Sequence, residues 1–285
     1  MRELPHPTPR WRHLLRRALS VLAAAWATAA LAVWAGQDWL LFAPVGPPLG
    51  NPMAPQVVVE PVQLVADSGV VLTGWLAKPE QAGEVQHFPL VLYFGGNAEE
   101  VSANVSWAAK LDGWAILAVN YRGYGGNPGK PSEAALLADA LATYDWAKRR
   151  TDVDPTRIAV VGRSLGSGVA VHVAAHRPVH SAILLTPYDS IAAVARERFP
   201  YLPVDLLLRH RFDSLAKSAQ VAAPTLIVIA ELDRVISPAR GHFLAGAWQG
   251  PHEVVLSPAT GHADILSDAQ VWAAMHRWLK DRGRP

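Results

Sequence analysis

One segment of this chain, residues 158–175, constrains the fold more than any other. Four apolar residues, 158–161, lead into Gly-Arg-Ser-Leu-Gly at 162–166, and an Ala/Val-rich stretch follows at 169–175. This order predicts a β-strand, a sharp turn with Ser164 at the bend, and a helix that directs its amides at the serine. The two glycines are required because larger side chains would collide with neighbouring backbone in so tight a turn. The alternative, an ordinary Gly/Ser loop, leaves the flanking strand and helix unexplained.

A nucleophilic serine needs a histidine as its base, and the histidine needs a carboxylate to orient it. An apolar strand at 224–230 is followed at once by Glu231 and Asp233, and a short strand further along is followed by His262. Both loops lie beyond strand ends, where open α/β sheets place their ligands. We therefore expect a triad of Ser164, Asp233 and His262, in which Asp233 fixes the tautomer of His262. Glu231 is the nearest competitor for the carboxylate.

Other titratable residues fit these roles less well. The remaining downstream histidines lie in helical patterns or at a strand start: His242, His276 and His252. Two further carboxylates come after the histidine of the triad and rank below Asp233 for that reason: Asp264 and Asp268.

An oxyanion formed at Ser164 needs two backbone donors, and one is the amide of the next residue, Leu165. The second is expected in the turn after an earlier central strand. Such a strand is followed by Gly-Gly-Asn at 95–97, where glycines let backbone amides approach a substrate closely. We expect Asn97 to be the second donor, with Gly95 as the next candidate. The alternative is an ordinary turn with an Asn cap.

Several motifs together resemble a known family: Gly95-Gly-Asn-Ala98, Asn120-Tyr-Arg-Gly-Tyr-Gly125, Pro131-Ser-Glu133, Gly162-Arg-Ser-Leu-Gly-Ser-Gly168 and Gly261-His262. Over residues 58–282 the chain is similar to the membrane-anchored α/β-hydrolase-domain proteins of the serine-aminopeptidase-like branch. The resemblance implies a serine hydrolase with the triad Ser164, Asp233 and His262, and it names no substrate. The family usually has His-Gly-Asn in place of Gly-Gly-Asn, but the missing imidazole is not a triad member.

Along the rest of the chain, apolar strands alternate with helices. An opening antiparallel hairpin is expected at 57–65 and 70–78, and further strands at 90–94, 115–119, 158–161, 182–185, 225–230 and 253–256. Helices are expected from Glu99, from Ser132, after Ser164, and at about 238–248 and 267–281. This alternation predicts an α/β fold with a mostly parallel central sheet and helices on both faces.

The N-terminal region predicts one transmembrane helix. Residues 1–17 carry five arginines against one acid, and the 19 residues at 18–36 carry no charge. As a helix this stretch rises about 28 Å, close to the thickness of the hydrocarbon core of a bilayer. The arginines stay inside under the positive-inside rule, which places the catalytic domain outside the cytoplasm, on the periplasmic or equivalent side. The alternative is a cleaved secretion signal with an Ala-x-Ala site at 30–32.

These features divide the chain into a basic tail at 1–17, a signal-anchor and interfacial segment at 18–43, a Pro-rich linker at 44–56 and the α/β-hydrolase domain at 57–285. Within that domain, residues 187–222 are expected to form a lid or substrate wall. Arginines surround an apolar run in this region. They fit either a solvated surface or a wall for an acyl chain with an anionic head group.

The sequence thus predicts a membrane-anchored serine hydrolase that cleaves an ester, thioester or amide through an acyl-Ser164 intermediate. Its expected partners are the membrane and an acyl-containing substrate, such as a lipid or an acylated protein. A net charge of +2 gives no sign of a nucleic-acid surface. The chain has no cysteine for a thiolate metal site, and we expect no metal or organic cofactor. The alternative is a catalytically silent, membrane-anchored binding module on the same scaffold.

Overall fold

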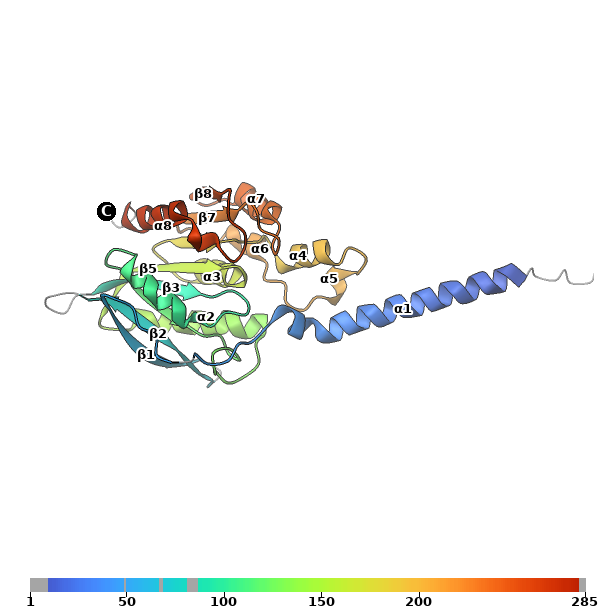
Figure 1. The fold of residues 1–285 in the computed structure, drawn as a ribbon, viewed down its shortest axis with the longest axis horizontal. Helices are drawn as coiled ribbons and strands as arrows, with labels where there is room; N and C mark the ends of the chain where they lie inside the picture. Colours follow the sequence, from blue (N-terminus) through green and yellow to red (C-terminus); the bar gives the residue numbers. More distant parts are fainter. Residues whose placement is uncertain (1–9, 49, 67–68, 81–86, 282–285) are drawn as a thin grey trace, which may run out of the picture.

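An eight-stranded sheet forms the centre of the molecule (Figure 1). The computed structural model describes residues 10–48, 50–66, 69–80 and 87–281. The strands are β1 (Val57–Val65), β2 (Val71–Pro79), β3 (Phe88–Phe94), β4 (Ala115–Val119), β5 (Val153–Arg163), β6 (Ala182–Leu185), β7 (Thr225–Ala230) and β8 (His252–Ser257). They lie in the order β1-β2-β4-β3-β5-β6-β7-β8. Only the β1–β2 and β2–β4 pairs are antiparallel among these strands, so the prediction of a mostly parallel sheet is confirmed.

Helices connect the strands and cover both faces of the sheet. They are α1 (Arg10–Leu41), α2 (Glu133–Lys148), α3 (Leu165–His176), α4 (Ile191–Arg198), α5 (Val204–Leu207), α6 (Ser214–Ser218), α7 (Pro238–Ala247) and α8 (Ala269–Asp281), with the 3₁₀ helices η1 (Val101–Ala109) and η2 (Ile265–Ser267). Residues alternate between the two faces along each central strand. In β3, for example, Leu90 and Leu92 pack into the core beneath α2 and α3, whereas Val91 and Tyr93 pack into the core beneath η1 and α8.

Most predicted strand boundaries agree with the structure to within two residues, but β5 begins five residues earlier than expected. The helix expected from Glu99 is wrong in type and start, because the segment is a 3₁₀ helix that begins at Val101. The carboxylate of Glu99 turns back to the amide of Gly96, and Glu100 accepts from the amide of Ser102 as the cap of η1. Both glutamates therefore precede the helix instead of opening it.

The segment between β6 and β7 forms a cap, defined here as residues 187–222, that carries α4, α5 and α6. Helix α1 runs beside the cap at its C-terminal end, and its N-terminal part stands clear of the body (Figure 1). By length and hydropathy α1 could cross a membrane, and few of its apolar residues are buried in the protein. The first nine residues of the predicted basic tail and the last four of the predicted hydrolase domain lie outside the described residues.

Candidate active site

Ser164 lies at the bend between β5 and α3. Its backbone has φ 52° and ψ −120°, a conformation that residues with a side chain rarely adopt. A Cβ atom at Gly162 would lie 2.2 Å from the carbonyl oxygen of Gly166, and one at Gly166 would lie 2.1 Å from that of Phe94. The close approach predicted for these two glycines is therefore confirmed. The packed backbone of β3 and α3 holds Ser164 in its strained position.

Hydrogen bonds join the three predicted triad residues in a continuous chain. Nε2 of His262 lies 2.8 Å from Oγ of Ser164, and Nδ1 of His262 lies 2.7 Å from Oδ2 of Asp233. The other carboxylate oxygen of Asp233 accepts from the backbone amides of Val235 and Ile236 at 2.8 and 2.9 Å. Both oxygens of this buried carboxylate are therefore occupied, and its orientation toward the imidazole is fixed.

The loop that carries His262 is itself fixed by polar contacts. Oδ1 of Asp264 accepts from the amide of Gly261 at 2.8 Å, and the amide of Leu232 donates to the carbonyl of Thr260 at 3.0 Å. The second of these bonds ties the histidine loop directly to the loop of Asp233. Asp264 therefore stabilises the loop and does not contact the imidazole in the described hydrogen bonds.

The competing residues are paired elsewhere. Oε1 of Glu231 lies 2.9 Å from Nε2 of His242, on the exposed side of the β7 loop. His276 pairs with Asp112, and His252 lies against the carbonyl of Gly250. The structure thus brings Asp233, and not Glu231, to His262.

The two predicted oxyanion donors lie on either side of Ser164. Leu165 is the first residue of α3, so its amide has no partner within that helix. Across from it is the turn 95–97, where a Cβ atom at Gly96 would lie only 3.5 Å from Cβ of Ser164. The side-chain oxygen of Asn97 is used structurally, because it accepts from the amides of Ala98 and Ala43.

Two buried tyrosines hold this turn in place. Tyr121 donates to the carbonyl of Gly95 at 2.9 Å, and Tyr124 donates to Oδ1 of Asn97 at 2.7 Å. Burial raises the pKa of Tyr124 to about 12 and that of Tyr121 well above its usual value. Both phenols therefore remain protonated donors at neutral pH. They provide fixed hydrogen bonds to the turn 95–97.

Sequence reasoning did not identify Glu99, which links the turn to Arg163 at the end of β5. Its carboxylate accepts from the amide of Gly96 at 2.6 Å and from the hydroxyl of Tyr93 at 2.7 Å, and it forms an ion pair with Arg163 at 2.9 Å. Arg163 directly precedes Ser164. The sequence offered two signals for this pair: a glutamate after Gly-Gly-Asn and an arginine inside the Gly-x-Ser-x-Gly pattern. Each follows or ends a strand, and adjacent parallel strands bring such ends together.

Comparison with known proteins agrees with this architecture. The family model described as alpha/beta hydrolase fold matches residues 89–206. The uncharacterized protein Rv2307c of Mycobacterium tuberculosis is 35% identical over 258 residues, which cover 87% of this chain and 89% of that protein. The alpha/beta hydrolase domain-containing protein WAV2 of Arabidopsis thaliana is 29% identical over 228 residues, covering 71% and 72% of the two chains.

Solved structures show the same fold. An acetyl xylan esterase from a Paenibacillus species superimposes with a TM-score of 0.66, at 22% identity, over 82% of this chain and 86% of the esterase. The sheet order, the strained serine between β5 and α3 and these matches agree with one another. The chain therefore belongs to the α/β-hydrolase family.

Proposed function

We propose that this protein is a membrane-anchored serine hydrolase that cleaves an ester, thioester or amide through an acyl-Ser164 intermediate. The observation that carries this proposal is the hydrogen-bond chain from Oγ of Ser164 through His262 to Asp233. A hydroxyl, an imidazole and a buried carboxylate in this order can activate the serine. The family match supports the hydrolase class.

The geometry suggests a two-step reaction. In the first step Nε2 of His262 takes the proton of Ser164 while Oγ attacks the carbonyl carbon of the substrate. The oxyanion of the tetrahedral intermediate accepts hydrogen bonds from the amide of Leu165 and from the turn 95–97. His262 then protonates the leaving alcohol, thiol or amine, and the acyl group remains on Ser164.

In the second step water replaces the leaving group. His262 takes a proton from the water, whose oxygen attacks the acyl carbon and forms a second tetrahedral intermediate. Collapse of that intermediate breaks the bond to Oγ, and His262 returns the proton to Ser164. A carboxylic acid is released, and the enzyme is restored. Asp233 keeps the proton of Nδ1 directed toward itself throughout, so Nε2 remains the base.

Helix α1 is proposed to anchor the domain, with the arginines of its first turns in the cytoplasm and the hydrolase domain outside it. Its apolar, largely unburied surface supports this role. The Ala-x-Ala sequence at 30–32 lies inside the continuous helix, which favours an uncleaved anchor over a secretion signal. A reporter that is active only outside the cytoplasm, fused after residue 285, should give signal. A soluble protein with a new N-terminus near Val33 would support the cleaved signal instead.

A fluorophosphonate probe tests the mechanism directly, because it labels only an activated serine. The full-length wild-type protein in detergent should be labelled, and heat-denatured protein should not. Ser164→Ala should abolish labelling, whereas Ser106→Ala, which changes a half-buried serine of η1, should not affect it. Folded wild-type protein that resists the probe would favour a silent binding module.

A further inference from the structure

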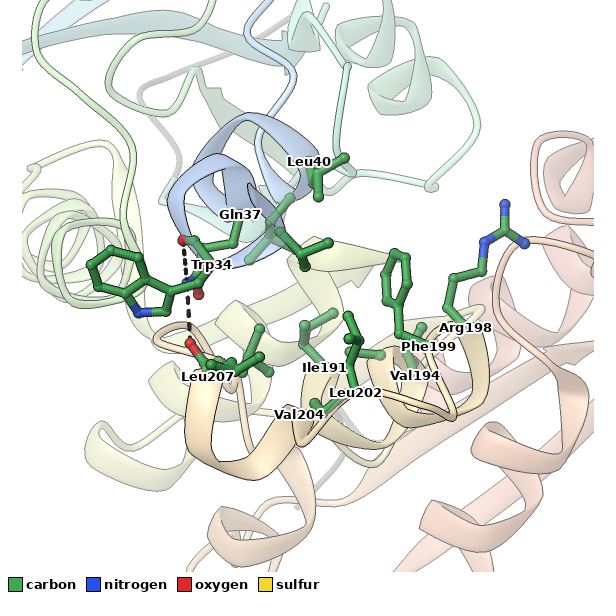
Figure 2. Close-up of a pocket in the computed structure, with 14 residues that line it drawn as sticks. Trp34, Gln37, Leu40, Ile191, Val194, Arg198, Phe199, Leu202, Val204 and Leu207 are labelled. Carbon is green, nitrogen blue, oxygen red and sulfur yellow. Dashed lines mark hydrogen bonds between the residues drawn. The ribbon is translucent and has the colours of Figure 1, made fainter. Parts of the chain in front are cut away.

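An apolar groove lies between the C-terminal part of α1 and the cap, and the triad does not line it (Figure 2). It encloses about 200 Å³. Its walls are formed from α1, α4, α5 and the segments beside α5: Val33, Trp34, Gln37, Leu40, Leu41, Ile191, Val194, Ala195, Arg198, Phe199, Leu202, Val204, Leu207 and Leu208. Twelve of these fourteen residues are apolar. An open apolar groove of this kind suits an apolar ligand.

The glutamine in the wall does not make the groove polar. Nε2 of Gln37 donates to the carbonyls of Trp34 and Leu207, at 2.9 and 3.1 Å. Its Oε1 accepts from the amide of Arg209 at 2.7 Å, and the residue is buried. Its polar atoms are therefore used to join α1 to the cap. The other polar residue, Arg198, lies at one end of the groove (Figure 2).

Helix α1 is attached to the cap along more than two turns. Nε1 of Trp26 donates to the carbonyl of Tyr201 at 2.9 Å. Nearer the end of the helix, Asp38 accepts from Arg209 at 3.0 Å and lies 2.9 Å from His210. These contacts make the anchor helix a structural wall of the groove.

The same contacts place the groove at the membrane surface. The uncharged stretch 18–36 includes Trp26, which bonds to the cap, and reaches Val33 and Trp34 of the groove wall, so a bilayer that this stretch crosses ends beside the cap. There Tyr201 and Leu206 are 87% and 85% exposed. Large exposed apolar side chains next to an anchor helix are suited to the lipid side of the interface.

The inner ends of both walls reach the catalytic residues. Two residues beyond Leu41 of the groove, the amide of Ala43 donates to Oδ1 of Asn97 in the oxyanion turn at 2.8 Å. At the start of the cap, the hydroxyl of Tyr188 donates to the carbonyl of Leu165 at 3.1 Å, three residues before α4 begins. The two segments that form the groove walls are thus also bonded to the oxyanion turn and to the residue that follows Ser164.

We infer that this groove binds the long acyl chain of a membrane lipid, which enters between α1 and the cap directly from the bilayer. The inference rests on the proposed hydrolase function and names its substrate class. The acyl chain lies along the groove while its carbonyl carbon reaches Ser164. Each buried methylene contributes about fourfold to affinity, so the groove favours long chains.

Filling the groove tests the inference. Ala195→Phe on α4 places a ring among the lining residues, whereas Ala216→Phe places the same ring at an exposed position of α6. Full-length proteins in detergent are compared on p-nitrophenyl acetate and on p-nitrophenyl esters of 12 to 16 carbons. Ala195→Phe should lower the ratio of long-chain to acetyl kcat/KM by about tenfold or more, with most of the change in KM. Ala216→Phe should leave the ratio unchanged.

Comparison of the two substrates distinguishes failure of the acyl-chain inference from failure of the proposed hydrolase function. If wild-type protein does not hydrolyse the acetyl ester in a Ser164-dependent way, the proposed function is wrong. If it does, but Ala195→Phe keeps the wild-type ratio, the acyl-chain groove is wrong.

A second arm tests the bilayer as the source. The full chain in nanodiscs that contain a phosphatidylcholine with a diazirine in its acyl chain is irradiated, and cross-linked peptides are mapped. We expect adducts in residues 33–41 and 191–208, retained in Ser164→Ala and reduced in Ala195→Phe. Adducts confined to α1, with none in residues 191–208, would show that lipid surrounds the anchor without entering the groove, and would overturn the inference.

Discussion

Ser164, Asp233 and His262 each follow one of the parallel strands of a single sheet, whereas the two walls of the groove come from segments about 170 residues apart. The candidate triad is held by hydrogen bonds from loops whose ends the sheet already fixes. The groove exists only because α1 docks on the cap through Gln37, Asp38 and Trp26. Changes at the triad should therefore remove turnover of every substrate, and changes at the α1–cap contact should alter selectivity for chain length.

The largest effect is expected at Ser164, the proposed nucleophile. Ser164→Ala should lower kcat on a short ester by on the order of 10⁶, and His262→Ala should cost about as much, because the two residues act as one unit. The melting temperature should stay close to that of the wild type. Ester-hydrolysis assays on the purified proteins give kcat, and thermal unfolding gives the melting temperature. Substantial esterase activity in Ser164→Ala would contradict the proposed triad.

A smaller loss is expected at the oxyanion turn. Gly96 has no positive φ, but a Cβ atom there would lie 3.3 Å from Oε2 of Glu99 and 3.5 Å from Cβ of Ser164. Gly96→Val should therefore crowd the space that the oxyanion occupies and lower kcat by about 10²–10³. The loss of kcat should be equal for short and long esters. Near-normal turnover in the folded variant would show that the second oxyanion donor lies outside this turn.

The carboxylate behind the turn should matter less. Glu99→Gln keeps an acceptor for the amide of Gly96 but removes the charge that pairs with Arg163. We expect kcat to fall by about tenfold with little change in KM, since charge-assisted bonds are about twice as strong as neutral ones. Glu99→Ala should be worse than Glu99→Gln. Equal losses in the two variants would indicate general destabilisation instead of positioning.

The α1–cap contact should give the smallest change in catalysis and a measurable loss of stability. Gln37→Leu leaves the amide of Arg209 and the carbonyl of Leu207 without this partner, at a cost of about 1–3 kcal/mol. The melting temperature should fall by several degrees, and the ratio of long-chain to acetyl kcat/KM by severalfold. If kcat/KM changed equally for both esters, the groove would not determine selectivity for chain length.

Much of the sheet and the positions of the candidate triad residues follow from local sequence patterns. Each strand is a short apolar run, and Ser164, Asp233 and His262 directly follow such runs, so their neighbourhood at one sheet edge is a consequence of parallel topology. Local sequence distinguishes Asp233 from Glu231 less well, because both lie in the same loop. The structure separates them through backbone amides that point at Asp233 and a histidine that takes Glu231.

Other features depend on contacts that no local pattern encodes. The roles of Glu99 and Tyr124 arise because distant strand ends meet around one turn. The groove forms because Gln37 hydrogen-bonds to the cap. A glutamine near the end of an apolar helix does not indicate, from sequence, which residue it will bond to. Apolar composition predicts α1 as an anchor, but it does not predict that this helix packs on the cap and forms one wall of the groove.

Direct detection of the acyl-enzyme tests the central claim. Full-length protein is mixed rapidly with p-nitrophenyl acetate, the release of nitrophenol is followed, and quenched samples are digested for peptide mass spectrometry. We predict an initial burst of about one equivalent and an acetyl group on the peptide that contains Ser164. A burst that is absent while hydrolysis continues, or an acetyl group on another residue, would contradict the mechanism.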